Sequence, residues 1–316
     1  MRPWCSRCRA GTTSAACDRP GTLTQDFLLS LAQAIAKGLL TGMVYGLMAL
    51  GLSVIFGVMR VVNFAHGEMM VVGMYLAWAA FEYAGINPLF SLPVIAVLFF
   101  AMGYALQRGL IQPFISRPEH QQFLLLLAVA TLVVNACLAI AGPDSRSVQL
   151  DSQFDSYELG PLVFDAVRVH AAIAAVVIAG LLWYFFTRTR IGKAIRAAAD
   201  NHMGALVVGL DVRKLYAITF GVGAACVGAA GALMITIVPV TPVLAADYTL
   251  LAFVIVIVGG LGSMTGALLG GLLIGVSEAV AGLLLEPSLK SMFSFGLLIV
   301  VLLLRPQGLM GRKDSR

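Results

Sequence analysis

Three polar residues close together form the densest polar group in an otherwise apolar part of the chain. Asn63, His66 and Glu68 occur in Asn63-Phe64-Ala65-His66-Gly67-Glu68, between two long apolar runs. Polar groups with apolar surroundings are costly, and proteins often keep them for function. We expect a structural or gating role, in which Glu68 or Asn63 caps a helix and His66 is solvated; direct contact with a ligand is the alternative.

A further carboxylate lies inside a long apolar run. Glu278 follows Ile274-Gly275-Val276-Ser277. An ionised carboxylate that faces lipid is expensive, so Glu278 should face another helix, a cavity or a subunit interface. Two roles stay open: a buried carboxyl bonded to a neighbouring serine or to the backbone, and a side chain that lines a pathway.

The segment 188–214 is polar and basic, although long apolar runs lie on both sides. Its six cationic residues are Arg188, Arg190, Lys193, Arg196, Arg213 and Lys214. Asp200 or Asn201 is suited to cap a helix N-terminus, and Gly209 is suited to the position just after a helix end. An apolar stripe follows the N-terminal cap, formed by Met203, Leu206, Val207 and Leu210. We therefore predict a helix from about Asp200 to Val208.

This helix of about two turns is too short to be stable alone, so packing must hold it. One interpretation is a loop helix that lies on its own bundle or among lipid headgroups. The other is a knob that inserts into a partner protein. Composition does not separate the two interpretations.

Several kinds of chemistry have no residues to support them. Gly192-Lys193 lacks the upstream glycine and the Ser/Thr of a P-loop, so any ATP hydrolysis must come from a partner. No Ser-His-Asp set or His-Glu metal motif is present, so we expect no catalytic residue, no metal and no bound cofactor. Cys5-x-x-Cys8 could begin a zinc site, but residues 1–22 hold three cysteines and no histidine. We expect 1–22 to be a disordered tail.

The composition indicates a membrane protein. The 316 residues are 59% hydrophobic and 12% charged, with a mean hydropathy of +0.92; soluble proteins carry about 25% charged residues. The apolar runs are continuous rather than alternating, which favours helices over a barrel. The cations sit at the ends of these runs and form no patch with aromatic residues, which disfavours nucleic-acid binding. We predict an all-α polytopic integral membrane protein.

A membrane-spanning helix needs about twenty apolar residues. The candidate runs are 37–58, 67–84, 92–112, 122–141, 169–187, 215–238, 249–285 and 289–304. The loop 142–168 is net acidic and is predicted to lie outside, in the periplasm. The loop 188–214 and the end of the chain, including 313–316, are basic and are predicted to be cytoplasmic. The same topology places Asn63–Glu68 near the inner face.

Glycine-marked breaks interrupt the apolar runs near 60–68 and 259–266. The run 249–285 would be about 55 Å long as one helix, so it must cross twice with short helices or dip in and return. The residues of this break that we consider functional are Gly259, Gly260, Gly262 and Ser263. Paired broken segments point to the translocation site in transporters. The count is eight or nine crossings, and the side of the N-terminus depends on which count holds.

Four stretches of the chain carry distinctive motifs. They are Asn63-Phe64-Ala65-His66-Gly67-Glu68; Arg190-x-Gly192-x-x-x-Arg196-Ala197, followed by Ala205-x-x-x-Gly209 and Ala217-x-Thr219-Phe220; Gly259-Gly260-Leu261-Gly262-Ser263-x-x-Gly266-Ala267; and Arg305-Pro306-x-Gly308-Leu309-x-Gly311. Together these motifs resemble branched-chain amino acid ABC-transporter permeases of the LivH type. The resemblance covers about 38–312. The N-terminal head and Gln121-Gln122 depart from it.

The resemblance implies a single permease domain over 23–312 in the bacterial cytoplasmic membrane. It also implies a second homologous permease, two cytoplasmic ATPase subunits that use ATP, and a periplasmic substrate-binding protein. In this family the cytoplasmic loop 188–214 meets the ATPases. The positions that match the loop are Asp200, Asn201, Ala205, Gly209 and Leu210. Residues of both breaks, with Glu278, are then candidates for the pathway or its gate.

The substrate implied by the resemblance is a branched-chain amino acid. Related permeases carry urea, short amides or other amino acids, which stay as alternatives. An ion-coupled secondary transporter is the alternative from another class. It would need ionisable residues at mid-membrane, and Glu278 is the candidate for one.

Overall fold

The computed structural model describes residues 20–115, 117–150, 155–284 and 290–311. Most of the predicted tail, residues 1–19, lies outside this part of the chain, as does 313–316. Residues 20–22, also assigned to the tail, already belong to the first helix.

The elements in chain order are α1 (Pro20–Met59), α2 (His66–Ala84), α3 (Pro88–Leu106), η1 (Gln107–Ile111), η2 (Gln112–Phe114), α4 (Glu119–Ala141), β1 (Ser156–Leu159), β2 (Leu162–Asp165), α5 (Ala166–Arg188), α6 (Arg190–Asp200), α7 (His202–Val207), α8 (Val212–Met234), α9 (Leu244–Gly259), α10 (Met264–Leu284) and α11 (Lys290–Leu304).

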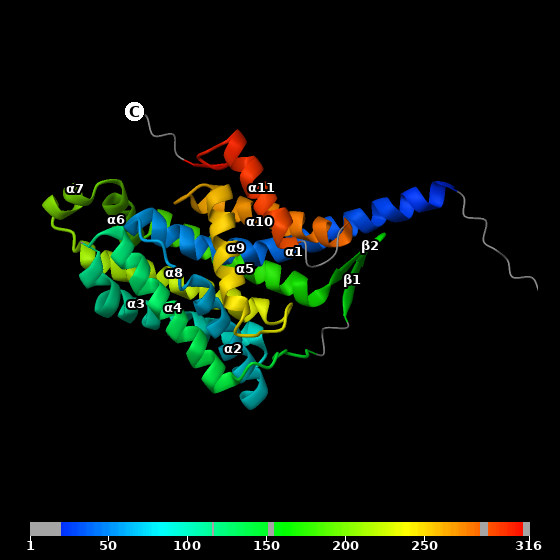
Figure 1. Cartoon of the computed structure of the whole chain (residues 1–316), viewed down its shortest axis with the longest axis horizontal. Coiled ribbons are helices and arrows are strands. Elements are labelled where there is room, and N and C mark those ends of the chain that lie inside the picture. Colours follow the sequence, from blue (N-terminus) through cyan, green and yellow to red (C-terminus); the bar gives the residue numbers. More distant parts are fainter. Residues whose placement is uncertain (1–19, 116, 151–154, 285–289, 312–316) are drawn as a thin grey trace, which may run out of the picture.

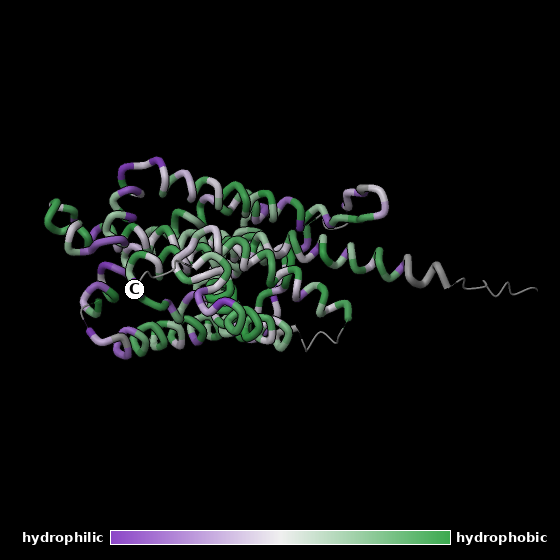
Figure 2. Tube along the Cα trace, turned by 90° about the horizontal axis from the view of Figure 1, so that it is seen from above, coloured by the Kyte–Doolittle hydropathy of each residue, from purple (hydrophilic) through white to green (hydrophobic). Residues whose placement is uncertain are grey.

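Long apolar helices dominate the molecule (Figure 1). Six segments of the described chain are long and apolar enough to cross a membrane: Asp26–Met59, Pro88–Phe114, His120–Ala141, Ala166–Arg188, Val212–Met234 and Met264–Leu284. Leu244–Gly259 and Met292–Leu304 are shorter apolar helices. In Figure 2 hydrophobic residues run along the helices, and hydrophilic residues gather mainly at one end. The prediction of a helical multi-pass membrane protein is confirmed, and the exact number of crossings stays a prediction.

The helix α1 packs antiparallel against α10 through glycines. A Cβ at Gly275 would lie 2.5 Å from the Cα of Gly42 and 2.6 Å from the carbonyl oxygen of Gly38. A Cβ at Gly271 would lie 2.4 Å from the Cα of Gly46. Without side chains at these positions the two backbones come into direct contact, which is how tightly packed membrane helices associate.

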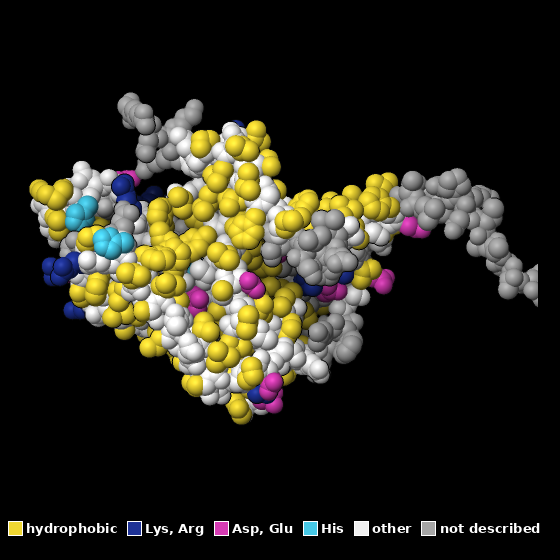
Figure 3. All heavy atoms as spheres, viewed as in Figure 1, with side chains coloured by type: hydrophobic (Ala, Val, Ile, Leu, Met, Phe, Trp, Pro, Cys, Tyr) yellow, Lys and Arg dark blue, Asp and Glu magenta, His cyan; other side chains and the backbone are white. Residues whose placement is uncertain are grey.

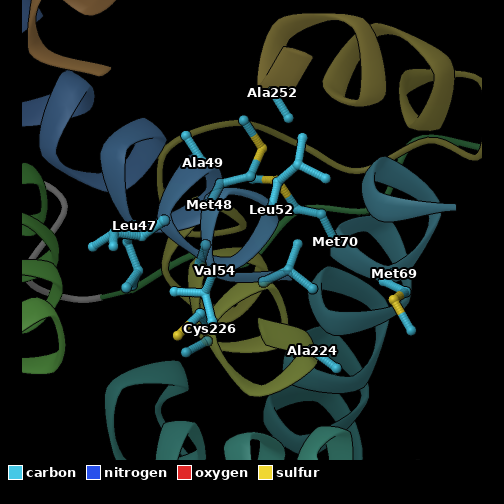
Figure 4. Packing of buried hydrophobic residues seen from close by; sticks show 14 of the residues in the cluster. Leu47, Met48, Ala49, Leu52, Val54, Met69, Met70, Ala224, Cys226 and Ala252 are labelled. Carbon is cyan, nitrogen blue, oxygen red and sulfur yellow. The ribbon is translucent and has the colours of Figure 1, made fainter. Parts of the chain in front are cut away.

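The helix α8 lies at the centre of the bundle. It contacts α1, α2 and α3, and most of its residues are buried. Glycines again allow two helices, here α1 and α8, to pack closely, since a Cβ at Gly51 would lie 2.6 Å from the carbonyl oxygen of Gly223. Figure 4 shows the packed cluster at this level, where Met48 of α1, Met70 of α2, Cys226 of α8 and Ala252 of α9 come together.

Both predicted breaks are present. The run 249–285 divides into α9 and α10, joined at residues 260–263. Between α1 and α2 the chain is non-helical from residue 60 to 65. There Arg60 adopts a left-handed backbone conformation, with φ 55°, and this stops α1.

A short β-hairpin corrects the all-α prediction. β1 and β2 pair antiparallel, with Ser156 opposite Asp165, inside the segment 142–168 that we predicted only as a loop. The side chain of Gln33 in α1 pairs with the backbone of β2. It donates to the carbonyl oxygen of Val163 and accepts from the Val163 N–H. Asp165 also pairs with Arg168 at 2.9 Å. This "hairpin end" lies opposite the "basic end" formed by 188–214 (Figure 1).

The contact between α1 and α10 predicts a position-specific effect of a single methyl group. Gly275→Ala should lower the unfolding temperature of the purified protein in detergent, because overpacking against the Gly42 backbone costs roughly 1–3 kcal/mol. Gly180→Ala in α5 is the matched control, since no atom lies within 4 Å of the added Cβ. The control should be neutral or slightly stabilising because alanine favours helix. Equal unfolding temperatures for the two variants would contradict the packing argument.

Candidate functional site

The polar group before α2 is buried. Asn63 and His66 are fully buried, and Glu68 is 6% exposed. The Asn63 carboxamide oxygen accepts a hydrogen bond from the Ala65 N–H at 3.1 Å and so shapes the turn into α2. Neither predicted cap forms, because the N-cap residue is Ala65 and it has no side-chain capping bond. Glu68 lies in the first turn of α2, where a carboxylate favours the helix dipole.

His66 connects α2 to the middle of α1. Its Nε2 lies 2.9 Å from the Met48 carbonyl oxygen. A carbonyl can only accept, so Nε2 carries the proton and Nδ1 does not. Within the described residues Nδ1 has no hydrogen-bond partner. The expectation of a solvated imidazole is therefore wrong.

The depth of this group also differs from the prediction. Met48 precedes Met59, the last residue of α1, by eleven residues, which is about 16 Å along a helix. After α1 ends, residues 60–65 turn back into the bundle, and α2 starts beside Met48. Asn63, His66 and Glu68 thus lie inside the bundle and not near its basic end. The charge pattern could not show this return, because the returning segment carries no charge after Arg60.

Thr249 of α9 clamps the start of α2. Its hydroxyl oxygen accepts from the Gly67 N–H at 2.9 Å and donates to Glu68 Oε2 at 2.9 Å. A Cβ at Gly67 would lie 2.2 Å from the Ala245 carbonyl oxygen, so glycine is required for this contact. One hydroxyl therefore satisfies a free helix N–H and a buried carboxylate together. The sequence did not single out Thr249, which looks like any polar residue of an apolar helix.

The glycine break at 259–266 is a tight joint. A Cβ at Gly259 would lie 2.2 Å from the carbonyl oxygen of Gly266, and Gly260 and Gly262 both have positive φ, 106° and 78°. The Ser263 hydroxyl accepts from the Gly266 N–H at 3.1 Å and so starts α10. The sequence singled out these residues, and the structure shows what each one does. The glycines allow the close contact and the positive φ angles, and the Ser263 hydroxyl caps α10.

The end of the chain binds to this joint. The Leu309 N–H donates to the Val258 carbonyl at 2.8 Å, and the Met310 N–H donates to the Gly259 carbonyl at 3.0 Å. Two of the motifs found in the sequence therefore meet in space. No spacing rule predicted this contact, since the two stretches are separated by the whole of α10 and α11.

A cavity of about 510 Å³ opens beside the joint at the basic end. Arg60, Asp200, Gly262 and Gln307 contribute to its lining, so it lies between α1, α6, the α9–α10 turn and the end of the chain. Asp200, a predicted partner-contact residue, thus shares a cavity with Gly262, a predicted pathway residue. Asn63, His66 and Glu68 do not line it.

The carboxylate of Glu278 is hydrogen-bonded to side chains of two other helices, and a role in a pathway stays a prediction. Its Oε1 accepts a hydrogen bond from the Ser294 hydroxyl at 3.3 Å, and Tyr45 also hydrogen-bonds to the carboxylate. It also lines a separate cavity of about 290 Å³ with Asp247 and Tyr248. Asp247 was missed because the predicted span began at 249. The signal was present, since Asp247 is a lone acidic residue beside that apolar run.

The predicted short helix is present as α7. Asn201 is its N-cap, and its carboxamide oxygen accepts from the Gly204 N–H at 2.8 Å. At the other end Gly209 has φ 84°, its N–H donates to the Leu206 carbonyl, and the Leu210 N–H donates to the Ala205 carbonyl, both at 3.0 Å. These two bonds form a Schellman motif. Asp200 is not the cap, because it is the last residue of α6.

The helix α6 was not predicted. Thr189 caps it, with the Gly192 N–H donating to the Thr189 hydroxyl at 3.0 Å. Gly192, Ile195 and Ala198 are buried, and this spacing of three residues is the helical signal that the charges concealed. The cations of α6 lie on the exposed side.

A small apolar surface on α7 faces away from the bundle. We call it the α7 knob; its residues and exposed fractions are Met203 70%, Leu206 48%, Val207 87% and Val208 81%. Ala205 faces inward and is buried. The knob lies at the tip of the basic end (Figure 1). Four adjacent apolar side chains are therefore exposed at this end of the molecule.

The comparison with known proteins agrees with this architecture. Residues 34–302 match the family model described as "Branched-chain amino acid transport system / permease component". The chain belongs to this family. Its described helices and its sequence are those of a multi-pass membrane permease.

Relatives with similar sequences are transport proteins. The high-affinity branched-chain amino acid transport system permease protein BraD of Pseudomonas aeruginosa is 29% identical over 297 residues, 89% of this chain and 96% of BraD. The corresponding protein LivH of Escherichia coli is 30% identical over 310 residues, 92% of this chain and 99% of LivH. A probable branched-chain amino acid transport permease protein LivM of Methanocaldococcus jannaschii is 29% identical over 155 residues, 43% of this chain and 45% of LivM.

The Thr249 clamp predicts an effect of its hydroxyl group. Thr249→Val preserves the shape but leaves the Gly67 N–H and the Glu68 carboxylate without this partner. Each unsatisfied group costs about 1–3 kcal/mol, so the unfolding temperature in detergent should fall. Thr249→Ser keeps the hydroxyl and should lose much less stability. Equal losses in the two variants would contradict a special role for the hydroxyl, because the methyl group would then contribute as much.

Proposed function

We propose that this chain is a transmembrane permease subunit of an ATP-binding-cassette importer in the bacterial cytoplasmic membrane. It forms the translocation pathway for branched-chain or related amino acids, which a periplasmic binding protein delivers. A second homologous permease and two cytoplasmic ATPases complete the transporter. The observation that carries the proposal is the α7 knob, an apolar surface held outside the bundle on a helix capped at both ends.

The surroundings of the knob support a soluble partner. Lysine and arginine resist translocation, so the basic end faces the cytoplasm, and the knob then lies in water. Exposed valines in water gain free energy when another protein covers them. The chain has no P-loop, binds no nucleotide or other cofactor itself, and takes its energy from ATP hydrolysed by the covering protein.

The contacts of α6 and α7 support a route for coupling. Asn201, Ala205, Gly209 and Leu210 fix the shape of α7, so it moves as one piece. Asp200 lies directly before it and lines the basic-end cavity with Gly262. Displacement of α7 by an ATPase would therefore act on the α9–α10 joint. Through α9 it would reach Thr249, and so Asn63, His66 and Glu68.

The names of the relatives support the substrate class. BraD, LivH and LivM are named for branched-chain amino acids. Urea or short amides are the alternative substrates within this class of permease. In that case the binding protein largely selects the substrate. An ion-coupled secondary transporter is the alternative from another class. Asp247 and Glu278, two acidic residues on one cavity, are the observation that keeps it open.

The knob predicts a loss of coupling on introduction of a charge. Val207→Asp should abolish ATP-dependent uptake while leaving membrane insertion intact, because the side chain is 87% exposed and supports no internal packing. Val207→Leu keeps an apolar surface and is the control. Uptake into vesicles and co-purification of the ATPases are the measurements. Normal uptake by Val207→Asp would remove the docking role.

The helix end at Gly209 also predicts a loss of coupling, here through the shape of α7. Gly209→Pro cannot adopt φ 84° and loses the N–H that bonds to Leu206, so α7 should lose its shape. Ligand-stimulated ATPase activity of the assembled transporter should fall to the unstimulated rate. Normal stimulation would contradict the coupling role. Transport by this chain alone, driven by an ion gradient, would overturn the importer proposal as a whole.

A further inference from the structure

The cavity that contains Glu278 lies deep within the membrane region. Tyr45 of α1 lines it, about 12 Å along the helix from Lys37 and about 22 Å from Arg60. The other walls come from α9, α10 and α11. Its depth matches the position of substrate sites in transporters, which lie near the bilayer midplane.

The carboxylate of Asp247 needs a partner outside the described contacts. Within the described residues, no hydrogen bond or ion pair engages it, and Asp247 is exposed in the isolated chain. A bare carboxylate against lipid at this depth is too costly to persist. The face of α9 that carries Asp247 must therefore border water or a polar ligand. Figure 3 shows acidic side chains set among apolar ones midway along the molecule.

Tyr248 adds an independent observation. Its side chain is 6% exposed and lines the same cavity, and it lies within electrostatic range of both Asp247 and Glu278. Among the described residues, no hydrogen bond engages its hydroxyl, and this oxygen is not one of the buried polar atoms that lack a partner. The hydroxyl is therefore open to the cavity, where a bound ligand can reach it.

The remaining walls are apolar. Leu251, Val254 and Phe295 also line the cavity. A volume of about 290 Å³ is small and suits a ligand of a few heavy atoms. The cavity thus combines negative charge and hydroxyl groups with hydrocarbon, which fits an ammonium group attached to a short aliphatic chain.

We propose that this carboxylate cavity is a binding site for the α-ammonium group of an aliphatic amino acid on its way through the membrane. Asp247 and Glu278 supply the charge, Tyr248 supplies a hydroxyl oxygen as acceptor, and Leu251, Val254 and Phe295 contact the aliphatic side chain. The inference deepens the proposed function and rests on it for the identity of the cargo. The Thr249 clamp belongs to the same site, because it fixes the rotation of α9 that directs Asp247 and Tyr248 into the cavity.

The first test is direct binding to the purified full chain in detergent. L-leucine and isopentylamine, which carry the ammonium group, should raise the unfolding temperature, whereas 4-methylpentanoate, which lacks it, should not. Asp247→Asn should weaken binding of both amines at least tenfold, since a charged hydrogen bond is lost. Asp26→Asn, an exposed carboxylate far from the cavity, should bind as the unchanged protein does. Stabilisation by 4-methylpentanoate alone, or by none of the three compounds, would overturn the site.

The second test is uptake of labelled L-leucine by the assembled transporter. Asp247→Asn should raise the KM for uptake at least tenfold and leave ATPase stimulation by the binding protein intact, and Asp247→Glu should recover part of the loss. Loss of the second permease from the purified complex would instead identify Asp247 as an interface residue and overturn the site. Binding of amines without any uptake by the unchanged protein would support the site and reject the importer function.

Discussion

The fold depends on the direct backbone contact between α1 and α10, which exists because glycines occupy both sides of it. With α10 held this close, α1 has its remaining faces free for α8, for the Gln33 bond to the hairpin and for the His66 bond to Met48. Every other site is therefore positioned relative to α1. A single side chain between these helices would displace the hairpin, the start of α2 and the α9–α10 joint together.

The helix α9 is the element that connects the separate sites. Thr249 fixes it to α2, Gly259 fixes its end against Gly266, and the end of the chain binds its last carbonyls. Directly before Thr249 the same helix presents Asp247 and Tyr248 to the carboxylate cavity. The contacts that hold α9 and the residues that line the cavity therefore belong to one rigid element.

The sequence predicted the local features of this protein well, because they follow from short-range rules. Asn201 and Gly209 predicted α7 through capping, and Gly259–Gly262 predicted a break through backbone freedom. The contacts of Glu68 with Thr249 and of Leu309 with Val258 could not be predicted, since they join segments distant in the chain. The depth of His66 was misjudged for the same reason. The predicted topology placed the break at 60–68 near the inner face, and no charge after Arg60 marks the return of the chain into the bundle.

The bonds from Leu309 and Met310 to the end of α9 have a consequence for the biogenesis of the protein. Membrane helices enter the bilayer in the order of their synthesis, and the last carbonyls of a helix have no partner within it. Val258 and Gly259 therefore wait for residues that are synthesised only after α10 and α11. The α9–α10 joint reaches its final form only once this segment has been made, so chains that stop before it differ in structure from chains that carry it.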